Sequence, residues 1–402
     1  MHTGPLTFAP AKSAIKGTAL VHADFIVTGV VMTMLGPMLP MFSARWLLND
    51  TQAGYLFVAQ FATSMLGMLL SGVLVERLGY RRTLRVGLVL MAAGMAMLVR
   101  ANWTLGLVAV SIYGVGFGSN TPAGNLFIAD ANPGNRAAAL NLLNSSWGIG
   151  AMGCPLLIAW AQRSRHVPLF FDGTATALLG LAAWLSWVQF SADGKLAGAE
   201  PPSGASAASA GPSSPRLVFF AAVLFFIYVG TENSLGGWVA SYARRMDMGS
   251  RAFWATTPSF FWGALLLGRI SAPLFLRRAR ETTVASAGLV LASLGVIVLL
   301  AARSMSLVVV GASLAGLGLA SVFPISISML SHWFGEAARR VSGTIFAGGN
   351  LGGAVLPWLV GALSTHYGSL RAGFVVPLLG AMSMLAVYVA NGRPPRRALG
   401  PA

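Results

Sequence analysis

The segment that decides the fold is Gly72-Val-Leu-Val-Glu-Arg-Leu-Gly-Tyr-Arg-Arg82. It closes an apolar run over residues 52–75 with a short group of charged residues, and a second apolar run over 83–100 follows directly. A helix of roughly 20 apolar residues crosses the hydrocarbon core of a bilayer, which is about 30 Å thick. The segment is therefore typical of a charged turn between two transmembrane helices.

The composition of the whole chain agrees with a membrane protein. Of the 402 residues, 55% are hydrophobic and 9% are charged, and the mean hydropathy is +0.71. Soluble domains carry roughly 25% charged residues. The net charge of +16 does not indicate nucleic-acid binding, because the basic residues lie in short groups between apolar runs instead of along one face. We expect an integral membrane protein surrounded by lipid.

Apolar runs of membrane-spanning length recur along the chain in two sets. The first set covers 19–42, 52–75, 83–100, 104–129, 137–160 and 168–190, and the second covers 216–241, 252–276, 283–302, 305–331, 341–363 and 370–391. Between them, residues 191–215 are rich in Gly, Ala, Ser and Pro, the composition of a flexible linker. The pattern predicts an all-α protein of about twelve transmembrane helices: a six-helix bundle over 1–190, a linker over 191–215 and a second six-helix bundle over 216–402.

The basic residues also predict an orientation. Most Lys and Arg residues fall on the side that would hold the two termini and the linker, and cytoplasmic loops carry this excess. The first apolar run has no small-residue cleavage pattern, so we expect a retained helix instead of a signal peptide. We expect both termini and the linker in the cytoplasm, in a bacterial inner membrane, and a monomer.

The two sets of runs resemble each other at an offset of about 200 residues. Three pairs of segments match in the same order: Leu35-Gly36-Pro37 with Leu235-Gly236-Gly237, Arg81-Arg82 with Arg277-Arg278, and Gly150–Pro155 with Gly352–Pro357. Such an offset indicates an internal repeat, which membrane transporters commonly contain. We therefore expect two homologous bundles related by a pseudo-twofold axis.

The segment quoted at the start has the form G-x-x-x-[DE]-R-x-G-x-[RK]-[RK]. It resembles the signature loop of the major facilitator superfamily. The resemblance implies the fold of that family, alternating access between its two bundles, and a gating role for this segment. The gating residues would be Gly72, Glu76, Arg77, Gly79 and Arg81. The alternative is an ordinary basic loop on the cytoplasmic side.

Longer stretches resemble one branch of this superfamily. Pro122–Phe127 and Leu140–Gly150 are similar to the fourth and fifth helices of fucose:proton symporter-like sugar transporters, and Tyr228–Trp238, Phe261-Trp262 and Gly268-Arg269 to the seventh and eighth. The resemblance implies transport of a sugar. The chain has Gly36 and Thr121 where that branch places acids in its first and fourth helices. Proton coupling through those usual carboxylates is therefore not expected.

Two acidic residues within the apolar runs are candidates for ion coupling. An ionisable group within a span is costly and commonly faces a cavity or a partner. Glu232 lies past the middle of the seventh run, and we expect it to couple transport to H⁺ or Na⁺ or to bind substrate; the alternative is a structural pair with Arg269. Asp24, near His22, lies only a turn or two inside the first run, where a gate, a cap or a structural role are alternatives.

Amides and tryptophans within the runs are candidates for a sugar site. Asn side chains match the hydroxyls of a sugar, and indole rings stack on its apolar face. The candidates are Asn144, Trp147, Asn233, Trp238, Trp262, Asn120, Asn125, Asn141 and Asn350. Asn144, Trp147, Asn233 and Trp262, together with Glu232, are preferred, because they lie on helices that line the cavity in the resembling family. Interhelical bonding by Asn and a place in the interface belt for Trp are the structural alternatives.

No sequence motif indicates an enzyme, a cofactor or a metal site. The chain lacks a nucleotide-binding P-loop, a zinc-protease motif and a nucleophile elbow, and its single cysteine is Cys154. We expect a secondary transporter of a small polar solute, most simply a sugar, driven by H⁺ or Na⁺. The alternatives are an efflux antiporter for amphipathic drugs or metabolites and a membrane receptor or scaffold without transport activity.

Overall fold

A computed structural model describes residues 12–188, 214–246, 253–334 and 337–391. Within these ranges every regular element is a helix. The first half contains α1 (Lys12–Thr33), α2 (Leu35–Trp46), α3 (Asp50–Leu98), α4 (Trp103–Ala131), α5 (Arg136–Arg163) and α6 (Val167–Trp187). The second half contains α7 (Pro215–Met246), the 3-10 helix η1 (Phe253–Thr256), α8 (Thr257–Leu276), α9 (Glu281–Ala301), α10 (Met305–Leu319), α11 (Val322–Phe334), α12 (Ala338–Tyr367), α13 (Leu370–Gly373) and α14 (Val375–Asn391).

The sequence predicts a turn between the second and third apolar runs, and in the structure the helix is interrupted there at a single residue. α3 continues through the charged segment, and its only non-helical residue is Gly79, with φ 80° and ψ 168°. Side chains disfavour this region of backbone space, whereas glycine reaches it without a steric penalty. Gly79 therefore reverses the chain while the residues on either side stay helical, and α3 consists of two arms.

Ten helical segments among the described residues are long and apolar enough to span a membrane. One of them, Asp50–Leu98, contains both arms of α3, and α4 is not among the ten. If the two arms of α3 are counted separately and α4 is added, the total is twelve helices, the number expected from the sequence. The number of membrane crossings itself stays a prediction.

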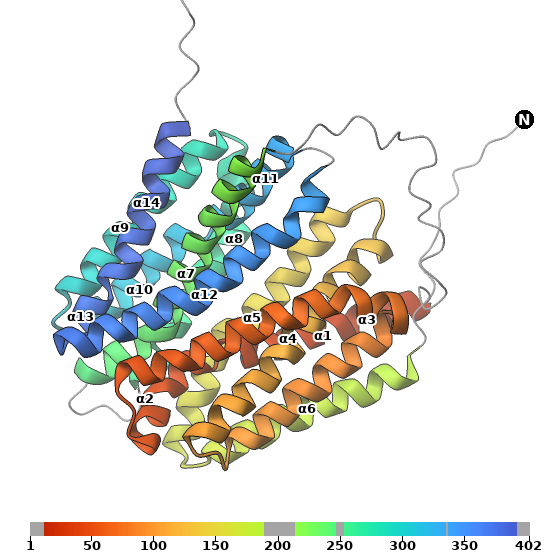
Figure 1. The fold of residues 1–402 in the computed structure, drawn as a ribbon, viewed down its shortest axis with the longest axis horizontal. Coiled ribbons are helices and arrows are strands. Elements are labelled where there is room, and N and C mark those ends of the chain that lie inside the picture. The colour runs from red at the N-terminus through yellow and green to blue at the C-terminus, as the bar shows by residue number, and fades with distance from the viewer. Residues whose placement is uncertain (1–11, 189–213, 247–252, 335–336, 392–402) are drawn as a thin grey trace, which may run out of the picture.

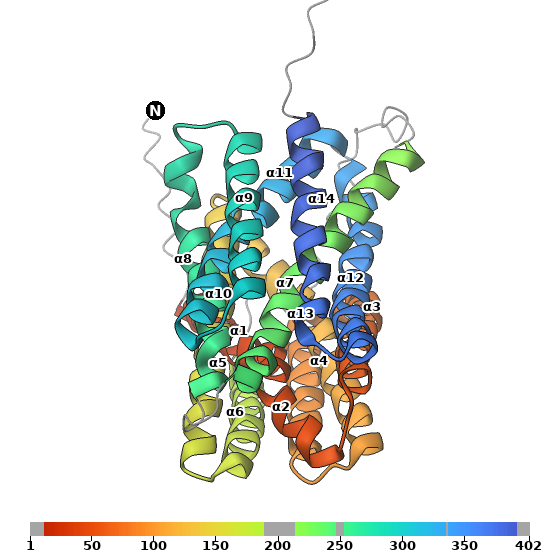
Figure 2. The same ribbon diagram turned by 90° about the vertical axis from the view of Figure 1, so that its left-hand side faces the viewer.

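The helices form two groups that follow the order of the chain. Figure 1 shows the first half, red to yellow, below the second half, green to blue, and Figure 2 shows α2 and α6 in the lower part and α9 and α14 in the upper part. α3 packs against α4 and α6, and α7 packs against α12 and α14. Between the groups, α3 packs against α12 and α5 against α8. These two interfaces correspond to each other under the expected repeat, because the second helix of each half meets the fifth helix of the other half.

Close backbone contacts at glycine residues also correspond between the two halves. A Cβ atom at Gly150 would collide with the carbonyl oxygen of Ile26, and a Cβ atom at Gly352 would collide with that of Phe226. The backbones of the first and fifth helices of each half therefore touch, which small residues allow in membrane bundles. Gly36 lies against Gly236, its counterpart in the repeat, with the built Cβ atom 2.5 Å from the Gly236 oxygen. A residue that contacts its own counterpart lies at the pseudo-twofold axis.

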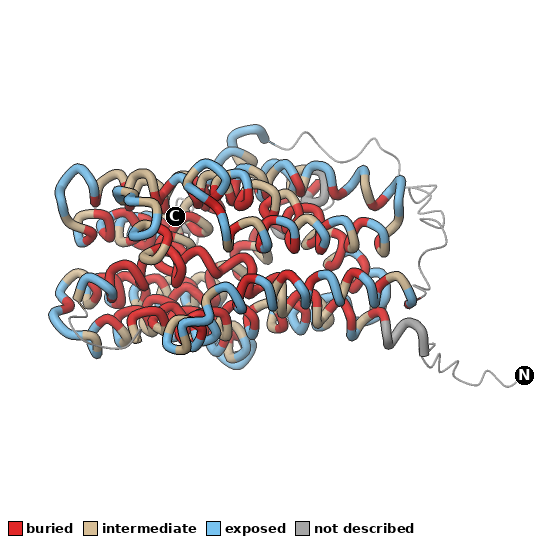
Figure 3. The backbone as a smooth tube through the Cα atoms, turned by 90° about the horizontal axis from the view of Figure 1, so that it is seen from below, coloured by how far each residue is buried: buried red, intermediate tan, exposed pale blue. Residues whose placement is uncertain are grey.

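The surface of the bundle is apolar. Figure 3 shows buried residues in the interior and exposed residues around the periphery. Leu69 is 64% exposed, Leu274 63% and Trp187 87%, among many other large apolar side chains. Water-soluble monomers rarely expose contiguous apolar surface on this scale. The periphery is therefore a surface for lipid. The expected linker over 191–215 lies almost entirely outside the described residues.

Candidate substrate and coupling sites

The two halves are held together at one end of the bundle, which we call the closed end; it contains the start of α3 and the ends of α7 and α12. Arg245 donates two hydrogen bonds to the carboxylate of Asp50, at 2.6 and 2.7 Å, and Ser364 also bonds to Asp50. The backbone N–H of Thr51 donates to the Thr365 hydroxyl at 2.9 Å. These bonds connect α3 of the first half to α7 and α12 of the second half.

Contacts between α3 and α12 run from the closed end only part of the way along the helices. Gly54 lies against Trp358, Gly353 lies against Phe61, and the Asn350 amide donates to the Met68 sulfur at 3.3 Å. The next glycine along α3, Gly72, has nothing within 4 Å of a built Cβ atom, and the same is true of Gly343 near the start of α12. The halves therefore separate beyond Met68, and we call this the open end.

Two tryptophans meet where α5 contacts α8. The rings of Trp147 and Trp262 lie edge to face, with centroids 5.7 Å apart. Trp262 is buried, its ring lies against the Cα of Gly236, and its indole N–H has no hydrogen-bond partner. The sequence placed both rings in a sugar site, and the structure brings them together at the interface between the halves.

A charged cluster lies one turn from Gly236 along α7. The Glu232 carboxylate accepts hydrogen bonds from the Tyr228 hydroxyl and from Arg269 of α8, the latter at 3.1 Å. Arg269 also donates to the Tyr228 oxygen at 3.2 Å and lies over the ring of Phe323. The Glu232 side chain is 10% exposed, so both charges are largely withdrawn from solvent. The Arg269 pairing, which the sequence left as an alternative, is present.

The predicted amides divide into two groups. Asn125, Asn144 and Asn233 donate to backbone carbonyls four residues earlier in their own helices, and Asn141 is exposed. Asn120 and Asn350 are buried and bond to other helices. Trp238 is buried, and its indole N–H donates to the Pro357 oxygen at 2.8 Å, so it joins α7 to α12. The described contacts bring only Trp147 and Trp262 of this set directly together.

Asp24 is buried within the first half. It lies seven residues after Gly17, where its apolar span begins, or about 10 Å along a helix at about 1.5 Å per residue. Its Oδ1 accepts from the Thr28 hydroxyl at 2.9 Å and from the Asn120 amide at 3.2 Å, whereas Oδ2 has no partner. His22 turns to α5, where its Nδ1 lies 2.8 Å from the Ser146 hydroxyl. Asp24 therefore joins α1 to α4 and caps no helix end.

The segment expected to act as a gate lies at the open end. Glu76 and Arg77 are exposed and Arg81 is partly exposed. The close helix contact expected of Gly72 is not made in this structure, because nothing approaches its Cα. Tyr80 of the same segment donates to the Asp130 carboxylate of α4 at 2.6 Å, which ties the break in α3 to the end of α4. Glu76 and Arg77 are thus exposed at the open end of the bundle in this structure.

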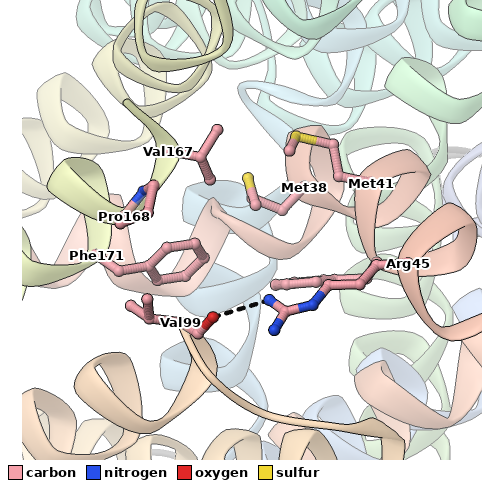
Figure 4. Close-up of a pocket in the computed structure, with 8 residues that line it drawn as sticks. Met38, Met41, Arg45, Val99, Val167, Pro168 and Phe171 are labelled. Carbon is pink, nitrogen blue, oxygen red and sulfur yellow. Dashed lines mark hydrogen bonds between the residues drawn. The ribbon is translucent and has the colours of Figure 1, made fainter. Parts of the chain in front are cut away.

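A separate pocket of about 210 Å³ lies at the closed end of the first half (Figure 4). Met38, Phe42, Val99 and Phe171 form part of its apolar wall, and Arg45 donates to the Val99 oxygen at 2.8 Å at one side. None of the predicted site residues lines this pocket. It is therefore distinct from the central cluster of Trp147, Trp262, Tyr228, Glu232 and Arg269.

Three side-chain contacts were not predicted from the sequence. Thr28 and Asp24 are four residues apart, as are Tyr228 and Glu232, and this spacing places both members on one helix face. The four-residue spacing could therefore have identified both pairs from the sequence. The Asp50–Arg245 pair joins residues far apart in the chain and outside any motif, so no local pattern could reveal it.

A family model described as Major Facilitator Superfamily matches residues 25–284 and 254–402. The glucose/mannose transporter GlcP of Bacillus subtilis is 25% identical over 390 residues, which cover 93% of each chain. The mouse sodium-dependent glucose transporter 1A is 22% identical over 383 residues, covering 86% of this chain and 89% of that protein. These relatives are transporters and not enzymes.

Solved structures show the same fold. The xylose transporter XylE from E. coli, in an inward-open conformation, superposes with a TM-score of 0.75 at 13% identity, covering 93% of this chain and 95% of that chain. FucP of E. coli, a fucose:proton symporter solved in an outward conformation, gives a TM-score of 0.63 at 21% identity, covering 95% and 100%. The family model, the relatives and the fold confirm the assignment from the signature loop, and the chain belongs to the Major Facilitator Superfamily.

Proposed function

We propose that this protein is a secondary active sugar transporter that binds a hexose at the central cluster and moves it by alternating access, coupled to an ion gradient. The observation that carries the proposal is the cluster itself: two aromatic rings from different halves, near a carboxylate and a guanidinium at the interface between the halves. Sugar transporters among its relatives support the choice of substrate.

The chemistry of the cluster suits a sugar. Ring hydroxyls donate to a carboxylate such as Glu232 and accept from an indole N–H such as that of Trp262, while indole faces cover the apolar C–H surface of the ring. Arg269 holds the Glu232 carboxylate in place through their hydrogen bond. We assign substrate orientation to this carboxylate, and Asn144, Asn233 and Asn350 are candidates to turn toward the sugar in other states.

The basic residues support an orientation with the open end in the cytoplasm. Arg77, Arg81 and Arg82 lie at the open end, and positive charge accumulates on the cytoplasmic side of membrane proteins. The structure then corresponds to an inward-open state of two bundles, 1–190 and 216–402, with both termini and the 191–215 linker in the cytoplasm. The higher superposition score with the inward-open XylE than with the outward FucP supports this state. We place the protein in a bacterial inner membrane.

Counterflow in proteoliposomes tests the substrate. Vesicles loaded with unlabelled glucose, mannose or galactose should transiently accumulate the labelled sugar without ATP or an ion gradient. A matched variant, Asp172→Asn, changes an exposed acid on α6 and should behave as the wild type.

Failure of every hexose, with exchange of a lipophilic cation instead, would overturn the sugar assignment and favour drug efflux. Failure of both classes of solute would favour the receptor or scaffold alternative.

A further inference from the structure

We infer that Asp24 and Asn120 form the proton-binding site that couples transport to a proton gradient, and this inference rests on the sugar transport proposed above. Asp24 is 2% exposed and Asn120 is fully buried. Asp24 lies in α1, within the candidate membrane span Gly17–Trp46, where an ionisable group is costly unless it serves a function, and Asn120 lies in the neighbouring helix α4.

The unpartnered atoms of this pair identify the missing bond. Asp24 Oδ1 accepts from the Asn120 amide nitrogen at 3.2 Å, and the two atoms left without partners are Asp24 Oδ2 and Asn120 Oδ1. An ionised carboxylate can only accept hydrogen bonds, so Oδ2 and the amide oxygen cannot bond to each other. A proton on Oδ2 would make it a donor, and we assign the unpartnered amide oxygen of Asn120 as its acceptor. One proton therefore satisfies both buried atoms.

Among the described residues, no positively charged side chain bonds to Asp24 in place of that proton. Within the described residues, Asp24 forms no ion pair, and its hydrogen bonds go only to Thr28 and Asn120. The titratable or charged groups on the helices packed against α1 are Arg45 of α2, Tyr113 and Asp130 of α4, Arg136, Cys154 and Arg163 of α5, and Asp172 of α6. None of them bonds to Asp24. His22 lies two residues away on α1, a spacing that places it on a different side of the helix, and it bonds to Ser146.

The same contacts favour a proton over Na⁺. Hard cations in proteins are surrounded by several oxygen ligands. The hydrogen bonds of Asp24 go to one hydroxyl and one amide N–H, so only one of these two partner atoms, the Thr28 hydroxyl, is an oxygen that a cation could use. Glu232 is the weaker candidate for proton binding, because Arg269 and Tyr228 already occupy its carboxylate.

The contact between Asp24 and Asn120 also links proton binding to the packing of α1 against α4. When the proton leaves, a carboxylate oxygen and an amide oxygen are left as two acceptors in one buried contact, which weakens the association of α1 and α4. α4 contains Pro122 two residues after Asn120, and proline removes a backbone hydrogen bond and allows a helix to bend. Proton binding would thus favour the packed arrangement seen here.

Asp24→Asn tests the inference in proteoliposomes. An amide at position 24 keeps a hydrogen bond to Asn120 but cannot exchange a proton. We expect counterflow of the hexose to continue, whereas accumulation driven by a pH gradient falls to the level seen without a gradient. Asp172→Asn is the matched control and should keep both activities, and Asp24→Ser removes the carboxyl in a second way if Asp24→Asn does not fold.

Two outcomes overturn the inference while leaving sugar transport intact: proton-driven accumulation that persists in Asp24→Asn, or wild-type accumulation that follows a Na⁺ gradient at equal pH and ignores the pH gradient. Wild-type protein that exchanges no hexose at all contradicts the proposed function instead. Proton uptake by purified protein on addition of the sugar gives an independent readout, expected in the wild type and absent in Asp24→Asn.

Discussion

Glu232 shows how a single residue acquires its role from its neighbours. A carboxylate within a membrane span is costly, and here Arg269 supplies the opposite charge while Tyr228 supplies a hydroxyl. This arrangement holds the carboxylate in one position at the level of Trp262. An acceptor held in this way is suited to orienting a sugar hydroxyl.

Glu232→Gln should therefore weaken sugar binding more than coupling. The amide loses a charge-assisted bond to a hydroxyl, and we expect affinity to fall about tenfold to a hundredfold, or about 1.4 to 2.8 kcal/mol. Binding is measured by titration of the purified protein and coupling by the accumulation ratio at saturating sugar. Unchanged affinity together with lost accumulation would show that Glu232 carries the ion after all.

At the scale of helices, the closed end depends on close backbone contact. Gly36 of α2 and Gly236 of α7 meet at the pseudo-twofold axis, and no side chain larger than hydrogen fits between them without movement. The Asp50–Arg245 pair joins α3 to α7 nearer the closed end. Its Arg245 side chain is 45% exposed, so the pair is partly screened by solvent and contributes modestly.

Gly36→Val should hold the closed end apart. The added methyl groups would meet the Gly236 carbonyl, so the state seen here becomes less populated and the opposite, outward-open state more populated. This shift can be measured with a cysteine introduced at Trp262 and a membrane-impermeant reagent added outside. The cysteine should be labelled faster in the protein that carries Gly36→Val than in the protein that keeps Gly36. Unchanged labelling would mean that the two helices do not part at this point during transport.

Asp50→Asn should also increase the population of the outward-open state, but by less than Gly36→Val does. Exposed ion pairs contribute up to about 1 kcal/mol, which corresponds to roughly a fivefold change in the ratio of the two states. Arg245→Gln is the reciprocal variant, and the double variant should be no worse than either single one. Additive effects on outside labelling would show that the two side chains act independently.

The signature segment gives a prediction at the opposite end. Arg77 is exposed in this state and would take part in closing the open end in the other. Arg77→Ala should slow transport several-fold and leave sugar binding nearly unchanged. Initial rates of counterflow and equilibrium titration separate the two quantities; a normal transport rate would remove the gating role and leave only a basic loop.

For the whole molecule, the sequence was sufficient to predict the class of fold, because hydropathy, loop charge and the repeat each depend on local composition. Most helices begin and end within a few residues of the apolar runs, although α1 begins at Lys12, before its run 19–42, and that run contains two helices. Gly36 and Gly236 of the matched repeat segments are in contact. The sequence could not predict which polar residues bond to each other. The Asp24–Asn120 and Asp50–Arg245 contacts join helices whose relative rotation is set by packing of the entire bundle.

The central claim is that the two halves rock about the central cluster, closing the open end when the sugar moves through. Spin labels at Gly72→Cys and Gly343→Cys measure this directly, because neither position touches other residues and the native Cys154 is buried. In proteoliposomes, addition of a transported hexose should increase the population with a short distance between the labels. A distance distribution that stays the same with and without a transported sugar would contradict the account.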